Sequence, residues 1–158
     1  MPIASELMTA DPATVRDSAK VTEAVRIFQA LDIRHLPVVN AQRELIGMLS
    51  DRDLRGLALP HMLNSEWLGT IQTALEARVS SLMSSDALSV DTEAEVTEII
   101  DLMLDNKIGA VPVVDAENKL VGIVSYVDLP AAPCSRVRPL ASARGARGEL
   151  PDTYPFGL

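Results

Sequence analysis

The chain has 158 residues, of which 47% are hydrophobic and 23% are charged, a composition typical of a globular protein that can bury a core. Its formal net charge of −8 argues against nucleic acid and anionic membranes as partners, because binding to either depends on Lys and Arg side chains that neutralise phosphates. The single cysteine, Cys134, excludes an intrachain disulfide and a cysteine zinc site. No apolar run is long enough to cross a bilayer and no secretory signal opens the chain, so we expect a soluble, cytoplasmic protein.

The first pattern along the chain is a short strand followed by a helix. Residues 14–16 are the candidate strand. Apolar side chains at helical spacing predict a helix from Ala19 to Leu31, with Leu31 as the last member of its buried stripe. Asp17 or Ser18 is expected to cap this helix, because their side-chain oxygens accept the unpaired N–H groups of a first turn.

A hairpin and a second helix follow. The apolar runs Leu36–Val39 and Leu45–Leu49 are joined by a polar turn, which indicates two antiparallel strands. A helix beginning at Ser50 is expected to stop near Pro60, which cannot continue it. The sequence therefore predicts a β-α-β-β-α unit.

This unit occurs twice. Pro37 and Pro112 are 75 residues apart (112 − 37), and the same spacing relates the residues at many other positions, which indicates a duplicated structural unit. In the second copy Thr92 and Glu95 form a capping-box pattern ahead of a predicted helix. We expect repeats at 1–59 and 79–129, a helical linker at 60–78 and a flexible tail at 130–158.

The linker carries its own helical pattern. A helix beginning after Asn64 or Ser65 would place one apolar stripe on a single face, formed by Trp67, Leu68, Ile71, Ala74 and Leu75. This stripe is expected to pack against the repeats, with a partner or dimer surface as the alternative. His61 and Trp67 are interpreted as ordinary packing residues rather than a ligand-binding pair.

Each repeat ends in the motif Gly-x-x-Ser-x-x-Asp, at Gly47 to Asp53 and at Gly122 to Asp128. A glycine lets a ligand approach the backbone, and a serine at a helix start lies beside unpaired N–H groups that suit a phosphate or a ribose oxygen. The aspartate one turn later could accept both hydroxyls of a ribose. The alternative is a capping box, in which the serine and the aspartate serve only their own helix.

The paired motifs h-P-V-V and G-h-h-S-x-x-D-L, with Leu-Met near the start of each copy, resemble a tandem pair of cystathionine-β-synthase (CBS) domains, the Bateman module, over Ala4 to Leu129. The resemblance implies an α/β (α+β) fold in which two β-α-β-β-α CBS repeats pack about a pseudo-twofold axis and leave two clefts. It also implies clefts that bind adenine nucleotides (AMP, ADP or ATP), sometimes NAD or S-adenosylmethionine. Two such modules commonly join as a homodimer.

The same resemblance implies ligand-binding residues in both copies. In the first copy they are Thr14, Val15, Arg34, His35, Pro37, Ser50, Arg52 and Asp53. In the second they are Ser89, Val90, Pro112, Ser125 and Asp128. The aspartates would bind the ribose, with the serines beside ribose or phosphate, and the first-strand residues would face the adenine.

Arg34 and His35 are implied to contact phosphate, with Arg52 as a further candidate, whereas the second copy has Gly109 and Ala110 at the equivalent positions and offers no charge there. We therefore expect unequal clefts. One, built on Arg34, His35, Ser50 and Asp53, should prefer a phosphorylated nucleotide. The weaker one lies at Ser125 and Asp128. The alternative for the Arg-His pair is a solvated charge at a strand start.

No catalytic constellation and no metal-binding pattern is present in the sequence. We therefore expect a protein that is not an enzyme and requires no cofactor. The favoured function is a stand-alone regulatory module that senses an adenine nucleotide and signals to an unknown protein partner. The alternative is a structural dimerisation module whose clefts are vestigial.

Overall fold

The computed structural model describes residues 1–58 and 65–130. His61 and nearly all of the predicted tail lie outside this part of the chain, as do the side chains of Trp67 and Leu68. In the described part, no helix is both long and apolar enough to cross a bilayer.

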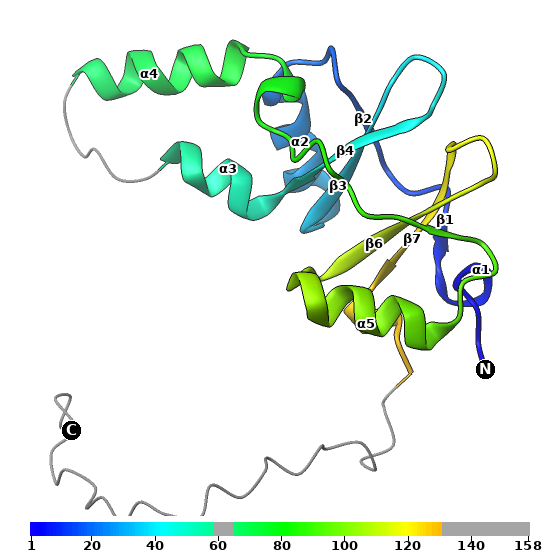
Figure 1. The fold of residues 1–158 in the computed structure, drawn as a ribbon. Coiled ribbons are helices and arrows are strands. Elements are labelled where there is room, and N and C mark those ends of the chain that lie inside the picture. Colours follow the sequence, from blue (N-terminus) through cyan, green and yellow to red (C-terminus); the bar gives the residue numbers. More distant parts are fainter. Residues whose placement is uncertain (59–64, 131–158) are drawn as a thin grey trace, which may run out of the picture.

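Helices and strands alternate through both repeats (Figure 1). The first repeat and the segment after it contain α1 (Ala4–Leu7), β1 (Thr9–Ala10), β2 (Val15–Arg16), α2 (Val21–Leu31), β3 (His35–Val39), β4 (Leu45–Ser50), α3 (Asp51–Ala58) and α4 (Ser65–Glu76). The second contains the 3-10 turn η1 (Val79–Ser81), β5 (Val90–Asp91), α5 (Val96–Asn106), β6 (Ala110–Val114), β7 (Leu120–Ser125) and the 3-10 turn η2 (Tyr126–Asp128). The predicted β-α-β-β order is confirmed in both copies, but the second copy ends in a single turn rather than a helix.

The strands form two sheets, one in the order β2-β3-β4 and one in the order β1-β7-β6-β5. Strand β2 runs parallel to β3 and β5 runs parallel to β6, and the two strands of each hairpin are antiparallel. The two hairpin turns lie side by side (Figure 1), where the Leu45 N–H donates to the Asn118 carbonyl and the Leu120 N–H donates to the Arg43 carbonyl. The mixed α/β fold with two packed repeats is as predicted.

The residues that lead into each repeat pack on the other repeat. We call residues 2–10 and 77–85 the leading segments. In the first, β1 pairs with β7 and the Ala4 N–H donates to the Ala94 carbonyl at 2.8 Å. In the second, the Val79 N–H donates to the Ala19 carbonyl at 2.8 Å. The repeats are therefore joined by an exchange of segments as well as by the meeting of their hairpins.

This exchange also determines how the two long helices begin. The Val21 N–H donates to the Ala77 carbonyl at 2.9 Å, and the Val96 N–H donates to the Pro2 carbonyl at 3.0 Å. In each case a backbone carbonyl of the other repeat's leading segment accepts from an N–H group for which a side-chain cap was expected. Neither helix has a side-chain cap hydrogen bond within the described residues. The predicted caps, Asp17 or Ser18 and the Thr92–Glu95 box, were therefore wrong.

Each sheet has an aliphatic core of its own. Leu36, Val38 and Leu49 are fully buried beside α2, and Val111, Val113 and Val124 are fully buried beside α5. Leu31 departs from the prediction, because 53% of its surface is exposed at the end of α2. Leu31 is therefore available to line a cleft rather than a core.

The C-terminal end of the linker helix α4 meets the start of α2 (Figure 1). The Thr22 hydroxyl donates to the Leu75 carbonyl at 2.8 Å, and the Lys20 ammonium lies 2.8 Å from a Glu76 carboxylate oxygen. The described part of this helix therefore contacts the first repeat.

Candidate functional site

Two clefts of about 590 Å³ each lie between the repeats. We name them by the aspartate of the repeated motif: Asp53 lines one and Asp128 lines the other. Such a volume is in the range of small-molecule sites. Two equivalent clefts are therefore available for ligands of nucleotide size.

Each cleft is built from both repeats. The Asp53 cleft combines the end of β4 and the start of α3 with residues 86–88 and 106–110 of the second repeat. The Asp128 cleft combines the end of β7 and η2 with Pro12, Ala13 and residues 31–35 of the first repeat. The two prolines are exchanged accordingly: Pro112 lines the Asp53 cleft, and Pro37 lines the Asp128 cleft.

The serine and the aspartate of each motif form a capping box. In the first repeat the Ser50 N–H donates to Asp53 Oδ2 at 2.8 Å and the Asp53 N–H donates to Ser50 Oγ at 3.2 Å. In the second, both the N–H and the hydroxyl of Ser125 donate to Asp128 Oδ2, at 2.8 and 2.9 Å. Among the described residues, Oδ1 of each aspartate accepts no hydrogen bond. The box therefore fixes the carboxylate and leaves one oxygen free to accept from a ligand.

The glycines of the motifs serve packing rather than ligand approach. A Cβ at Gly47 would lie 2.5 Å from Sδ of Met83 and 2.9 Å from the Ser84 carbonyl oxygen. A Cβ at Gly122 would meet Sδ of Met8. Both methionines come from the leading segments, so the expectation that these glycines open the backbone to a ligand was wrong.

Arg34 and His35 line both clefts. The His35 ring packs over Gly109, where a Cβ would lie 3.3 Å from His35 Cε1. The absence of a side chain at Gly109 therefore leaves room for the imidazole between the clefts. Because Arg34 and His35 line both clefts, they do not by themselves make one cleft prefer a phosphate, although from the sequence they were assigned to the Asp53 cleft alone.

The partly buried position of His35 favours the neutral form of its imidazole. Burial lowers the pKa of the imidazole below its ordinary value; the Asp51 carboxylate opposes this change, the Arg34 guanidinium adds to it, and the Asp53 carboxylate opposes it. A neutral imidazole can accept or donate a hydrogen bond. A dianionic ligand in either cleft would favour its protonation.

Four first-strand residues expected at the adenine do not line the clefts. Val15 and Val90 are buried in the two cores, and Thr14 and Ser89 are absent from the described cleft walls. The chain lines the clefts slightly earlier, with Ala13 and, in the second repeat, Leu88. Arg52, in contrast, lines the Asp53 cleft as expected.

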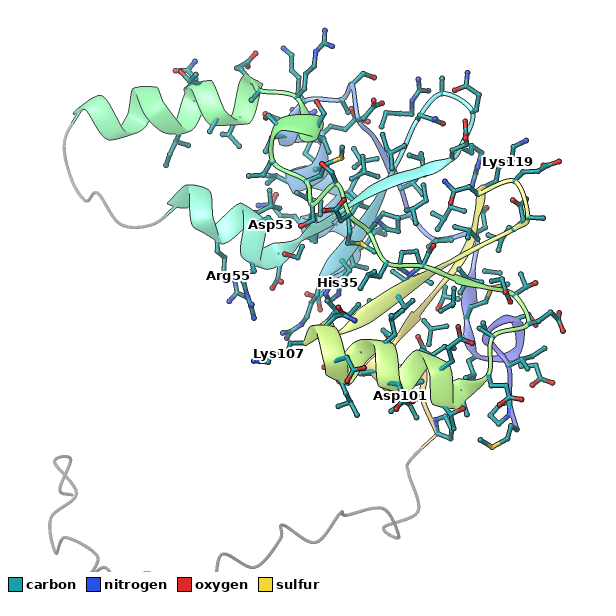
Figure 2. All side chains as sticks on the ribbon, in the orientation of Figure 1. His35, Asp53, Arg55, Asp101, Lys107 and Lys119 are labelled. Carbon is teal, nitrogen blue, oxygen red and sulfur yellow. The ribbon has the colours of Figure 1, made fainter. Side chains whose placement is uncertain are left out.

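Sequence reasoning missed several cleft residues, among them Asp32, Lys107 and Tyr126. Lys107 lines the Asp53 cleft, Asp32 lines the Asp128 cleft, and Tyr126 lines both. Figure 2 shows Asp53, His35 and Lys107 following one another from α3 to the end of α5. The repeat spacing could have found Lys107 and Asp32, because they are equivalent positions that directly follow the two long helices.

Comparison with known proteins gives these clefts a family context. The family model for the CBS domain matches residues 4–59 and 79–132. A structure of CBSX2 in complex with AMP is 27% identical, with a TM-score of 0.69, and covers 82% of this chain and 93% of that chain. A structure from Vibrio cholerae named as an acetoin utilization protein (AcuB) is 33% identical, with a TM-score of 0.68, and covers 81% of this chain and 87% of that chain.

A curated relative, the inosine-5'-monophosphate dehydrogenase of Methanocaldococcus jannaschii, is 26% identical over 93% of this chain. The chain spans only 26% of that dehydrogenase and 39% of a 33.4 kDa protein of Thermofilum pendens that it also matches. These partial matches give no reason to assign the enzyme's activity here. With the family model matched twice, the two-repeat fold and the two composite clefts, the chain belongs to the CBS domain family and contains a tandem CBS pair.

Proposed function

We propose that this CBS pair is a regulatory module of the cytoplasm that binds adenine nucleotides in its clefts and thereby alters its contacts with a protein partner. The observation that carries the proposal is the pair of equivalent clefts, each with a fixed carboxylate whose Oδ1 accepts no hydrogen bond from the described residues. The complex of the relative CBSX2 with AMP supports the same ligand class. AMP, ADP and ATP are the first candidates, with NAD and S-adenosylmethionine as further ones.

The chemistry of the side chains that line each cleft suggests which part of a nucleotide each would bind. The free Oδ1 atoms of Asp53 and Asp128 would accept hydrogen bonds from ribose hydroxyls. Arg34 would donate charge-assisted hydrogen bonds to a phosphate, and Arg52 would add to them in the Asp53 cleft. The backbone around Ala13 and Leu88 would face the base. Signalling requires that the ligand bind two states of the module with different affinity.

Specific observations also favour the alternative, a structural dimerisation module. The Ser-Asp boxes already cap their own helix or turn, as that alternative requires. Leu104, Tyr126 and Val127 are 70%, 61% and 71% exposed, and an apolar hollow of about 470 Å³ lies beside Leu104 and Tyr126. We propose that this surface joins two copies as a homodimer, which is compatible with either function.

Titration calorimetry with AMP, ADP, ATP, NAD and S-adenosylmethionine tests the sensor proposal. We expect at least one adenine nucleotide to bind, and Asp53→Asn together with Asp128→Asn to weaken binding by about tenfold or more, because a charged hydrogen bond is lost in each cleft. Asp101→Asn on α5 is the matched control, since this exposed carboxylate lines neither cleft. Absence of binding for every ligand would favour the structural alternative.

A further inference from the structure

The clefts differ in charge at one equivalent place, the residue that ends the long helix. Lys107 follows α5 with φ 54° and ψ 43°, and Asp32 follows α2 with φ 50° and ψ 42°. Lys107 lines the Asp53 cleft, and Asp32 lines the Asp128 cleft. The same left-handed backbone therefore presents an ammonium group to one cleft and a carboxylate to the other.

At two neighbouring pairs of equivalent positions, the residue in the Asp53 cleft is again the more polar one. Arg52 lines the Asp53 cleft, whereas its equivalent in the Asp128 cleft is Val127. Just before the helix-ending residues, Asn106 lines the Asp53 cleft and Leu31 lines the Asp128 cleft. The Asp128 cleft is thus the more apolar of the two as well as the one with a carboxylate in place of the ammonium.

The Asp53 cleft also contains carboxylates, Asp51 and Asp86. Asp51 Oδ2 is paired with the Arg55 guanidinium at 2.8 Å, so part of its charge is compensated. The shared Arg34 contributes a positive charge to both clefts. Asp86 offsets one positive charge in the Asp53 cleft, and the charge contrast that remains comes from Lys107 and Arg52 on one side and Asp32 on the other.

We propose that Lys107 and Asp32 determine which class of adenosine ligand each cleft takes. A phosphate is favoured beside Lys107 and opposed beside Asp32, because like charges at close range repel. The Asp53 cleft therefore takes adenosine phosphates. The Asp128 cleft takes an adenosine derivative whose 5′ substituent is uncharged or positively charged. This assignment rests on the proposed function, since it presupposes that adenosine compounds occupy the clefts.

The test uses three ligands that differ only at the 5′ position: AMP, adenosine and 5′-amino-5′-deoxyadenosine, which carry a negative, no and a positive charge there. Amide NMR spectra of the full chain report each cleft separately, through the Asp53 and Asp128 signals. We expect AMP to shift the Asp53 signal at about tenfold lower concentration than the Asp128 signal. The amino derivative should show the reverse order. Added salt should reduce both differences.

The exchange variant Lys107→Asp with Asp32→Lys gives the decisive comparison. Both residue types already occupy this backbone conformation in the other repeat, and Lys107→Gln with Asp32→Asn provides a milder version. We expect the exchange to reverse the order of the two clefts for AMP. Lys119→Asp with Asp101→Lys repeats the charge changes at exposed positions that line neither cleft and should leave the order unchanged.

The outcomes separate the two proposals. If none of the three ligands, nor ADP, ATP, NAD or S-adenosylmethionine, shifts any amide signal, the proposed function fails and this assignment fails with it. If ligands shift both cleft signals but the exchange leaves their order unchanged, the proposed function stands and Lys107 and Asp32 are not the determinants. Equal AMP affinity of the two clefts in the native chain would likewise overturn the assignment.

Discussion

The two repeats agree where they pack and differ where they face the clefts. Buried pairs are closely similar, as with Leu49 and Val124, which are both fully buried in equivalent strands. The cleft walls have diverged, as with the lysine and the aspartate that end the two long helices. The duplicated residues therefore preserve the fold and the Ser-Asp pair of each cleft, and the differing residues are expected to determine which ligand each cleft selects.

The largest effect is expected at a shared packing position. Gly47→Ala should lower the free energy of unfolding by about 1–3 kcal/mol, because its Cβ would overlap Met83 and the Ser84 carbonyl. Gly56→Ala in α3 is the control, since a Cβ there would meet no atom of another described segment within 4 Å, and the substitution should stabilise the helix by about 0.5–1 kcal/mol. Chemical denaturation measures both.

The second repeat offers an equivalent glycine, Gly122, whose surroundings differ from those of Gly47. A Cβ at Gly122 meets only Met8 side-chain atoms among its nearest neighbours in the described chain, whereas a Cβ at Gly47 also meets backbone. We expect Met8→Ala to recover more of the Gly122→Ala loss than Met83→Ala recovers of the Gly47→Ala loss. Equal recovery in denaturation experiments would mean that the Ser84 carbonyl moves away at little cost.

The two capping boxes provide a smaller effect. Ser50 caps an eight-residue helix, whereas Ser125 precedes a three-residue turn. Ser50→Ala should cost about 1 kcal/mol of unfolding free energy, a typical value for the loss of a helix cap. Ser125→Ala should cost less, because fewer N–H groups depend on it. A larger loss for Ser125→Ala would show that its hydroxyl matters through the Asp128 carboxylate instead.

The smallest effect concerns His35, which lies between the clefts. Because folding lowers the pKa of this imidazole below its unfolded value of about 6.5, its contribution to stability is present above about pH 6.5 and is lost as the pH falls through the folded pKa. The native chain should therefore lose stability on acidification slightly more than His35→Gln. Imidazole NMR titration should give a pKa that rises when AMP is added. An unchanged value would place the phosphate away from His35.

The sequence predicted the repeats, the hairpins and the Ser-Asp pairs because these depend on local spacing within one copy. It did not predict how the clefts are assembled. Arg34 and His35 were assigned to the Asp53 cleft, but this depended on which repeat faces which motif, and no local pattern carries that information. The helix caps failed for a related reason: the carbonyls of Pro2 and Ala77 replace the expected side chains, and both come from the leading segments.

The exchange of leading segments has a consequence for how the protein is made. Pro2 and Ala4 hydrogen-bond to Val96 and Ala94 at the start of the second repeat's long helix, so Ala4 is synthesised 90 residues (94 − 4) before the residue on which it docks. A nascent chain that ends before Val96 holds a first segment with no native partner. Neither repeat is then complete by itself, and the pair is the smallest unit expected to fold during translation.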